Sequence, residues 1–344
     1  FLGMKGIFNG VLSFDKVFVS AETRIGKEGE GFKIALQALN TGRISIAGIC
    51  TENSAKCLSI MRWWGKDRVQ WGKPIGEHEL IGSGMIVRAA AHTLAMEAVT
   101  DYVAGLADRG KDARLAASVA KVVAAEWAWT IMDDTMQMRG GRGYELSASL
   151  GKRDEAPPVD RMFADTRPNR IFEGSTEILA LWTAREGLDD YIARGASFLN
   201  KGQLLRKMAT AVGIAVEYAH HFLPREIRAL LSKDAEKDIL FVEKHARKLA
   251  RAIIRCSGKY QAKMAVKQLT NARLFWIATE LFAISATWSL ALSGRSRYFG
   301  ESSLAREVAA MYASIAKRRI KANFAALRDN DDDQARVLAK KLLA

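Results

Sequence analysis

Long amphipathic stretches dominate the first 190 residues of the chain. From Gly31 to Gly65, apolar residues recur at helical spacing, and the same spacing returns at residues 79–108, 113–138 and 175–193. Apolar side chains three and four positions apart line one face of an α-helix. The pattern therefore predicts four helices with polar connections, packed as an antiparallel bundle.

The connection between the third and fourth predicted helices has a different character. It contains the paired glycines of Gly140-Gly141-Arg142-Gly143 and, further on, Pro157-Pro158. Glycine and proline interrupt regular structure. We therefore expect a shaped loop here rather than another helix.

The start of the chain alternates like a strand. Residues 11–19 follow the turn signal Asn9-Gly10 and read Val-Leu-Ser-Phe-Asp-Lys-Val-Phe-Val, which predicts a strand. A strand needs partners, and the remaining sequence offers no obvious set. We therefore expect that part of the protein precedes Phe1.

Helical periodicity resumes after about residue 195, with Leu199, Leu204 and Leu205 among the first apolar positions, and continues through at least four helices. The segment Phe275–Leu292 is nearly continuous in apolar residues, with Glu280 as its only charge. It falls short of the roughly 20 apolar residues that cross a bilayer, so it predicts a buried helix of a bundle. The chain as a whole is predicted to be mainly α.

Composition narrows the class of protein. With 49% hydrophobic and 26% charged residues, the chain is typical of globular proteins. Cys50, Cys57 and Cys256 are too few and too scattered for a disulfide framework or a four-cysteine zinc site, which favours a reducing compartment and predicts no metal site.

Charge is distributed unevenly. The net charge is +14, and residues 191–344 hold 28 Lys and Arg against 13 Asp and Glu. The first 190 residues are therefore close to neutral, while the rest form a basic helical region able to meet an anionic surface.

The segment from Arg170 to Leu179 carries the strongest chemical signal. Glu173 stands between Phe172 and Gly174, and Ser175, Thr176 and Glu177 then have the chemistry of a helix start. Glu173 can balance the helix dipole. Alternatively, it is a catalytic base held among apolar groups.

Two further segments could hold a phosphate or a flat cofactor. Residues 68–75 read Arg-Val-Gln-Trp-Gly-Lys-Pro-Ile, and residues 137–144 read Gln-Met-Arg-Gly-Gly-Arg-Gly-Tyr. Arginine matches phosphate oxygens, and glycine lets the backbone approach them. Each segment alone is equally explained by turn chemistry or a glycine helix stop.

Taken together, in this order and at this spacing, these motifs resemble the acyl-CoA dehydrogenase family. Phe14-Asp15-Lys16-Val17, Gly29 to Phe32 and Leu39 to Arg43 add to the resemblance, which covers roughly residues 3–190. Residues 196–344 resemble, in length and helicity, the carboxy-terminal extension of the very-long-chain branch. The resemblance implies three regions: a remnant of the middle β domain (1–27), a helical bundle (28–194) and a basic helical extension (195–344).

The resemblance also implies a reaction and its residues. Glu173 would take the α-proton of an acyl-CoA, with a long acyl chain favoured, while hydride leaves the β-carbon for flavin N5 of FAD, giving a trans-2-enoyl-CoA in fatty acid β-oxidation. Glycine at position 42, where a branch of the family carries its base, leaves that role to Glu173. The implied substrate-binding residues are Asn40, Thr41, Gly42, Arg43 and Gly174. The implied FAD-binding residues, some reaching FAD from a neighbouring subunit, are Arg68, Gln70, Trp71, His78, Glu79, Gln137, Gly140, Gly141, Ser175 and Glu177.

The implied partners are an electron-transferring flavoprotein and a second copy of the chain in a homodimer. Because the family's amino-terminal helical domain and most of its β domain are absent, we expect these 344 residues alone to bind FAD poorly and turn over little. Two alternatives remain open: a flavin-fold protein whose basic extension binds nucleic acid, and an assembly scaffold. Contact of the extension with a membrane surface is a further expectation. The sequence leaves open bacterial cytoplasm or mitochondrion, and dehydrogenase or oxidase.

Overall fold

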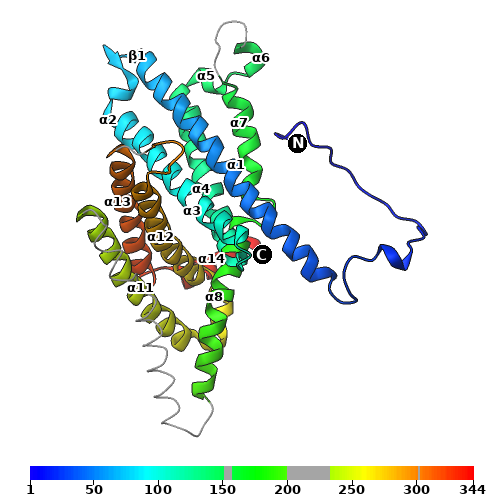
Figure 1. The fold of residues 1–344 in the computed structure, drawn as a ribbon. Coiled ribbons are helices and arrows are strands. Elements are labelled where there is room, and N and C mark those ends of the chain that lie inside the picture. The colour runs from blue at the N-terminus through cyan, green and yellow to red at the C-terminus, as the bar shows by residue number, and fades with distance from the viewer. Residues whose placement is uncertain (151–156, 200–232, 301–302) are drawn as a thin grey trace. The chain divides into compact units, whose positions relative to one another are not determined.

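The structure is a computed structural model that describes residues 1–150, 157–199, 233–300 and 303–344 (Figure 1). The chain divides into two compact units, Phe1–Thr176 and Glu177–Ala344. Helices dominate both. In the described part of the chain, strands are limited to one short antiparallel hairpin of β1 (Val69–Gln70) and β2 (Lys73–Pro74). The prediction of a mainly α protein is confirmed.

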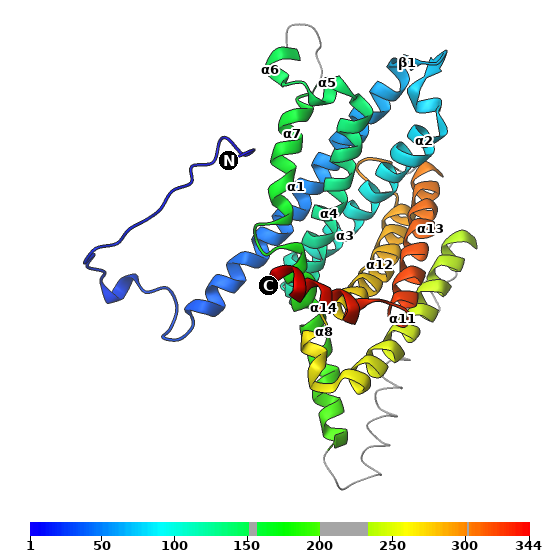
Figure 2. The same ribbon diagram turned by 180° about the vertical axis from the view of Figure 1, so that it is seen from behind.

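Three long helices form the core of the first unit: α1 (Gly31–Asp67), α3 (Val87–Asp108) and α4 (Arg114–Arg139). They lie side by side in both views of Figures 1 and 2. Arg43 of α1 contacts Ser118 of α4, and Trp64 near the end of α1 contacts Met138 near the end of α4. These two helices therefore run parallel. Helix α3 runs in the opposite direction and packs against both of them.

The predicted helix at residues 79–108 is interrupted near its start. It consists of α2 (Glu79–Ile81), a π-helical turn at Gly82–Ile86, and then α3. The interruption lies where the backbone at Gly76 crosses that of α1: a Cβ on Gly76 would approach the Gly65 carbonyl oxygen to 2.9 Å. Only glycine permits this approach, and the glycines that follow weaken the regular helix.

The expectation of a plain loop between α4 and the next long helix is wrong for the described residues. This connection contains α5 (Gly141–Tyr144), α6 (Ser147–Leu150), α7 (Val159–Thr166) and a 3-10 turn at Arg167–Arg170. Helix α7 packs on α4, with the rings of Trp129 and Phe163 4.7 Å apart. Pro158 precedes the first helical residue, where proline costs little. The apolar side chains that α7 buries against α4 therefore favour a helix, despite the glycines and prolines in this connection.

The strand predicted at residues 11–19 is also not formed. Among residues 1–30 the regular structure is a 3-10 turn at Ala21–Thr23, and the side chains of Val11 and Phe18 are almost fully exposed. Strand geometry is stable only when neighbouring backbone supplies hydrogen bonds. No such neighbour stands beside this segment in the described residues.

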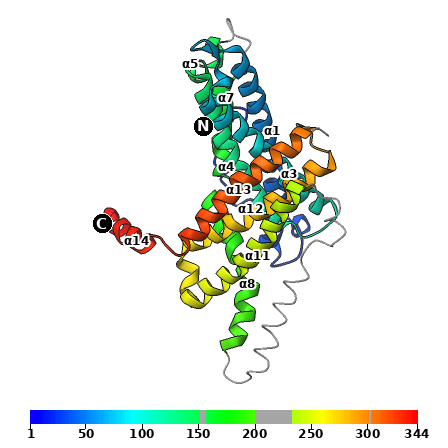
Figure 3. The same cartoon turned by 90° about the vertical axis from the view of Figure 1, so that its left-hand side faces the viewer.

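The second unit contains α8 (Thr176–Leu199, whose first residue closes the first unit), α11 (Lys233–Tyr260), α12 (Gln268–Ser293), α13 (Ser303–Ala326) and α14 (Asp332–Leu343). Helices α11, α12 and α13 pack against one another (Figure 3). The apolar positions predicted to start this region at Leu204, Leu205, Met208, Ala211, Val212 and Ile214 lie outside the described residues.

Helices α4 and α12 are both long and apolar enough to cross a membrane by composition, and two thirds of each apolar window is buried inside the protein. In α12 this agrees with the prediction of a buried bundle helix. Its buried Glu280 accepts hydrogen bonds from the Tyr312 hydroxyl (2.7 Å) and from Arg319 Nη1 (3.1 Å). Burial, and the neighbouring Glu280 carboxylate, raise the pKa of Tyr312 well above its ordinary value.

Two cations of the run Lys317–Lys321 are therefore used inside the second unit. Arg319 pairs with Glu280, and Lys317 pairs with Asp238, which also accepts a 2.9 Å hydrogen bond from Trp288 Nε1. The basic character of this run is thus partly structural, while Arg318 and Lys321 of the same run are exposed.

Helix α14 is tied to the unit by its acidic first turn. Asp332 makes a bidentate pair with Arg273 (2.6 and 2.7 Å), and Asp333 pairs with Lys267 (2.7 Å). The hydrogen bond from Arg273 holds the pKa of Asp332 below its ordinary value. The last two residues of the acidic run at residues 329–333 therefore anchor this helix.

Candidate active site

Glu173 lies in a tight turn between the 3-10 turn at Arg167–Arg170 and the first residue of α8, Thr176. The helix start predicted just after Glu173 is confirmed. Glu173 and Gly174 both have left-handed backbone, with φ of 57° and 96°. A non-glycine residue rarely adopts this conformation, and holding it there requires support from the surroundings.

The carboxylate of Glu173 covers Gly42 of α1. A Cβ built on Gly42 would lie 3.3 Å from both Cδ and Oε2 of Glu173. Oε2 is shielded from solvent and has no hydrogen-bond partner in the described residues. An acceptor oxygen buried without a donor is costly. It is suited to receiving a proton from a group that enters beside it.

Arg43 holds the turn from the side of α1. Its Nε donates to the Glu173 carbonyl oxygen (3.3 Å), and its Nη1 donates to Asn40 Oδ1 and to Ser118 Oγ (both 3.2 Å). Burial lowers the pKa of Arg43 and the nearby Glu173 carboxylate raises it, but guanidinium remains charged in proteins. Arg43 is thus a fixed cation beneath the turn.

Lys121 holds the turn from the side of α4. Its side chain is completely buried, and Nζ donates a 2.6 Å hydrogen bond to the Gly174 carbonyl oxygen. Burial lowers the pKa of the Lys121 ammonium to about 8. The neighbouring thiol of Cys50, whose pKa burial raises to about 12, stays uncharged at that pH.

Glu126 connects the two ends of the turn. Its Oε1 accepts a hydrogen bond from Arg170 Nε and another from the Thr176 hydroxyl, both 2.6 Å. A carboxylate that bridges both ends limits how far the residues between them can open. Side chains from α1 and α4 together therefore fix the turn that carries Glu173.

The structure brings most of the predicted substrate residues together. Asn40, Gly42 and Arg43 contact one another or the Glu173 turn, and Gly174 forms part of it. Thr41 is exposed on the outer side of α1, where its carbonyl accepts from Ser45. Ser175 and Glu177, predicted to contact FAD, follow the turn at the start of α8, with Ser175 half-buried and Glu177 exposed.

A second predicted group lies just beyond the carboxyl end of α1. Trp71 and Gly72 form the two-residue hairpin turn, with φ of 50° and 79°, as a type I′ turn requires. Arg68 donates to Gln70 Oε1 (3.1 Å), and the ring of His78 lies against Trp71 and is hydrogen-bonded to the Gln70 carbonyl. Trp71 is 85% exposed. Glu79, at the start of α2, is also exposed.

The third predicted group lies at the carboxyl end of α4, beside the second. Trp64 Nε1 donates to the Met138 carbonyl (3.0 Å), and the Arg139 guanidinium lies 4.2 Å from the Trp64 ring. Gln137, Gly140 and Gly141 are exposed. Side chains added at the two glycines would meet nothing within 4 Å, so their backbone faces open space.

The residues around Glu173 lie toward one end of α1, and the second and third predicted groups lie at its other end. Gly42 lies in the first third of this helix, and Arg68 follows its last residue. At 1.5 Å per residue these positions are about 40 Å apart. One FAD molecule cannot reach from one end to the other.

Sequence reasoning missed the residues that support Glu173 through space: Ser118, Lys121 and Glu126. Lys121 left a detectable signal, because it stands within the apolar run Ala-Ser-Val-Ala-Lys-Val-Val-Ala-Ala. A lysine on the buried face of a helix requires a partner. The sequence does not show which atom that partner is.

Comparisons with known proteins point to one family. Residues 29–188 match a family profile described as acyl-CoA dehydrogenase, C-terminal domain. A probable acyl-CoA dehydrogenase, FadE10, from Mycobacterium tuberculosis is 40% identical over 348 residues, which cover 96% of this chain and 52% of that protein. The rat mitochondrial very long-chain specific acyl-CoA dehydrogenase is 25% identical over 346 residues, covering 97% of this chain and 50% of its own length.

Among solved structures, an acyl-CoA dehydrogenase complexed with FAD from Bacillus anthracis matches with a TM-score of 0.62 and 21% identity. The match covers 93% of this chain and 54% of that one, and it shows a shared fold. The chain spans about half the length of the curated relatives it matches.

Proposed function

We propose that the chain acts as a member of the acyl-CoA dehydrogenase family, whose C-terminal domain matches residues 29–188. In this proposal it supplies the catalytic base for FAD-dependent α,β-dehydrogenation of a long-chain acyl-CoA, and Glu173 is that base. The observation that carries the proposal is the buried Oε2 of Glu173, which has no hydrogen-bond partner in the described residues and is held over Gly42 by two cations and a bridging carboxylate.

In the proposed reaction, Glu173 takes the α-proton of the thioester and the product is a trans-2-enoyl-CoA. A carboxylate positioned at fixed distance from the reacting carbon converts proton transfer into an intramolecular event. Arg43 and Lys121 contribute by holding the carbonyls of Glu173 and Gly174. Because both carbonyls point at these cations, the turn cannot rotate freely and the carboxylate stays over Gly42.

The residues at the other end of α1 fit FAD. Arg68 and Gln70 offer donors for a pyrophosphate, Trp71 offers an exposed ring, and the open backbone at Gly140 and Gly141 can approach a flat or anionic group. When bound, FAD supplies the acceptor at N5 for the hydride that leaves the β-carbon. Ser175 and Glu177, next to the base in sequence, are proposed to contact a flavin bound near Glu173.

The distance along α1 between the Glu173 site and the proposed FAD-binding residues at Arg68 favours a homodimer. Since about 40 Å separates Gly42 from Arg68, the two ends of α1 must serve different FAD molecules. We propose that a second copy of the chain supplies its hairpin and its Gly140-Gly141 segment to the FAD beside Glu173. An electron-transferring flavoprotein as the electron acceptor, and a bacterial cytoplasmic or mitochondrial location, complete the proposal.

Because these 344 residues alone are expected to bind FAD poorly, the proposed reaction is tested by anaerobic mixing of palmitoyl-CoA with FAD-loaded protein that also carries the remaining half of the curated relatives' length. We expect loss of the visible flavin absorbance and formation of an enoyl-CoA in equal amounts. Bound flavin that acyl-CoA of no chain length reduces would contradict the proposal and favour a binding or scaffold function.

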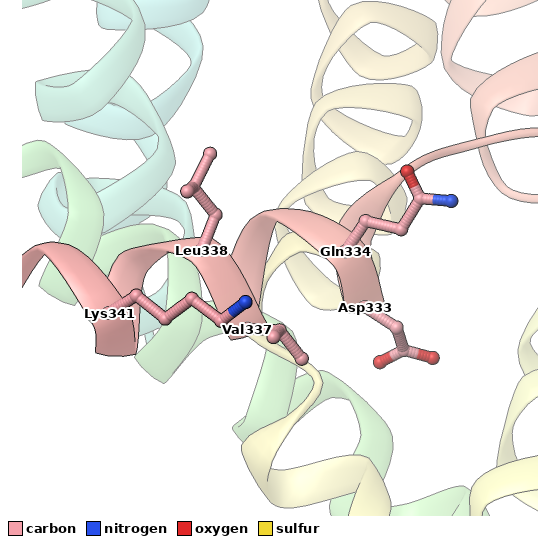
Figure 4. A pocket seen from close by; sticks show the side chains of 5 residues that line it. All are labelled: Asp333, Gln334, Val337, Leu338 and Lys341. Carbon is pink, nitrogen blue, oxygen red and sulfur yellow. The ribbon is translucent and has the colours of Figure 1, made fainter.

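A second proposal concerns the surface of α14. Figure 4 shows the Lys341 amine reaching toward Val337 on this helix, with Leu338 projecting from it in another direction; these three residues line a shallow pocket with Asp333 and Gln334. Leu342 and Leu343 are also exposed, and no residue of α14 is buried. Exposed leucines beside Lys340 and Lys341 are typical of helices that lie on an anionic membrane. We propose peripheral membrane contact through this helix.

Co-sedimentation with vesicles tests this contact. Because Leu338→Asp places a charge among the apolar side chains, we expect it to reduce binding to vesicles of anionic phospholipid by about tenfold or more. Leu269→Asp, a similarly exposed leucine at the start of α12, is the matched control and should bind like the wild type. Equal binding of both variants, or binding to duplex DNA instead of vesicles, would contradict the proposal.

A further inference from the structure

The turn that carries Glu173 has a strained backbone at Glu173 itself. Two successive residues, Glu173 and Gly174, have positive φ, and such a conformation in a non-glycine residue costs on the order of 1 kcal/mol or more. The turn persists because outside groups hold it. Among those groups, Lys121 makes a short, charge-assisted contact to the backbone, 2.6 Å from Nζ to the Gly174 carbonyl.

Burial of Lys121 makes this contact exceptional. Lysine is almost never fully buried unless its ammonium is paired, and here the whole side chain is inaccessible to solvent. The side chain starts in the middle of α4, one turn after Ser118, which holds Arg43. Two neighbouring turns of α4 thus support successive carbonyls of the Glu173 turn, one directly and one through Arg43.

We propose that Lys121 is a positioning residue whose ammonium holds the Gly174 carbonyl so that Glu173 stays over Gly42, and that loss of its proton loosens the turn. This inference rests on the proposed function of Glu173. Lys121 itself touches neither substrate nor flavin in this scheme. It acts through the backbone of the turn.

The charges around Lys121 set the pH at which this happens. Arg43 and Cys50 face it from α1, Glu126 from its own helix α4, and Glu173 from the turn. Burial is the largest influence and lowers the pKa of Lys121 to about 8; Arg43 acts in the same direction, while the two carboxylates oppose it. The proton is therefore lost within a pH range in which the protein can be studied.

The sign of the stability effect follows from this pKa. The ordinary lysine pKa is 10.5, so between about pH 8 and 10.5 the unfolded chain binds a proton that the folded chain has released. Folding then becomes more favourable as pH rises, by up to tenfold in the equilibrium constant per pH unit. Cys50 and Cys57 act oppositely above their ordinary pKa of 9, because burial raises their folded pKa to about 12.

Lys121→Met is the test variant, because methionine keeps the length of the side chain without the ammonium. On the FAD-loaded protein we expect flavin reduction by palmitoyl-CoA to slow about tenfold at pH 7. The wild-type rate should also fall above about pH 8, and this alkaline limb should be absent in Lys121→Met. Lys111→Met, an exposed lysine before α4, is the matched control and should keep both the rate and the limb.

A second measurement needs no flavin. Urea unfolding of the chain from pH 7 to 9.5 should show wild-type stability rising relative to Lys121→Met above about pH 8. The contribution of Cys57 cancels in this difference, whereas Cys50 is compared through the added variant Cys50→Ala, because Lys121 lowers the pKa of the Cys50 thiol. A constant difference across this range would overturn the titration of Lys121. The proposal is supported if the unfolding data show this titration and Lys121→Met also lacks the alkaline fall in the rate of flavin reduction. A purely structural lysine would leave that fall in place.

The two proposals fail differently. If Glu173→Gln abolishes flavin reduction while Lys121→Met retains the wild-type rate and pH profile, the positioning role is wrong and the base stands. If Glu173→Gln reduces flavin like the wild type, both the base and the positioning role are wrong. Lys121→Arg keeps its charge at every pH. Its rate of flavin reduction, divided by the wild-type rate at the same pH, should therefore be higher at pH 9 than at pH 7.

Discussion

Glu173→Gln is expected to slow reduction of the bound flavin by palmitoyl-CoA by about 10²–10⁴-fold, the usual contribution of a general base. Glutamine has nearly the same shape as glutamate and can occupy the space over Gly42. Its amide cannot accept the α-proton. The rate is measured by rapid anaerobic mixing, following the visible absorbance of the flavin, and FAD content is measured in the same samples.

The matched control is Glu236→Gln, an exposed carboxylate of α11 in the second unit. It should reduce flavin at the wild-type rate. A Glu173→Gln protein that binds FAD and is reduced as fast as the wild type would show that the proton goes to another group. A protein that binds palmitoyl-CoA normally but is not reduced would place the loss in the chemical step rather than in binding.

The local chemistry around Glu173 could be predicted from sequence because it depends on adjacent residues. A carboxylate before Ser175 and Thr176 indicates a helix start, and α8 indeed begins at Thr176. The support of the turn could not be predicted in the same way. Arg43 and Lys121 are separated from Glu173 by 130 residues and by 52, and no periodic pattern specifies which backbone oxygen a buried cation meets.

The two wrong predictions of local structure have one physical cause. Residues 11–19 have the alternation of a strand, and the connection after α4 has the composition of a loop, but burial decided each outcome. Pro157 and Pro158 themselves stay outside helices, and α7 starts directly after them. No backbone in the described residues pairs with the first segment, whereas α7 buries Val159 and packs the Phe163 ring at a tilt against that of Trp129. Propensity is a weak prior that tertiary packing overrides.

The arrangement along α1 was only partly visible in the sequence. The spacing of apolar residues predicts a long helix, and the helix Gly31–Asp67 is observed. Its consequence is that the proposed base and the proposed phosphate-binding groups are about 40 Å apart, which follows once the helix is known to be unbroken. Packing of α1 parallel to α4 then puts Arg43 beside Ser118 and Trp64 beside Met138, which only the structure reveals.

Gly42→Ala should test whether the space over Gly42 positions the base. A Cβ at this position would lie 3.3 Å from Cδ and Oε2 of Glu173, closer than ordinary contact, so the carboxylate must shift by a few tenths of an ångström. Small misplacement of a catalytic group is costly. We expect flavin reduction to slow by about 10- to 100-fold, while FAD content stays unchanged, as measured by the same anaerobic mixing.

The matched control for this change lies on the same helix. Gly48 also stands inside α1, and a Cβ there would meet nothing within 4 Å. Alanine is favoured over glycine in a helix by about 0.5–1 kcal/mol, so Gly48→Ala should raise the urea midpoint and leave the rate of flavin reduction unchanged. If Gly42→Ala behaves like Gly48→Ala in both measurements, the carboxylate is not confined over α1. If only Gly42→Ala loses rate, the missing side chain at position 42 is what leaves room for the base.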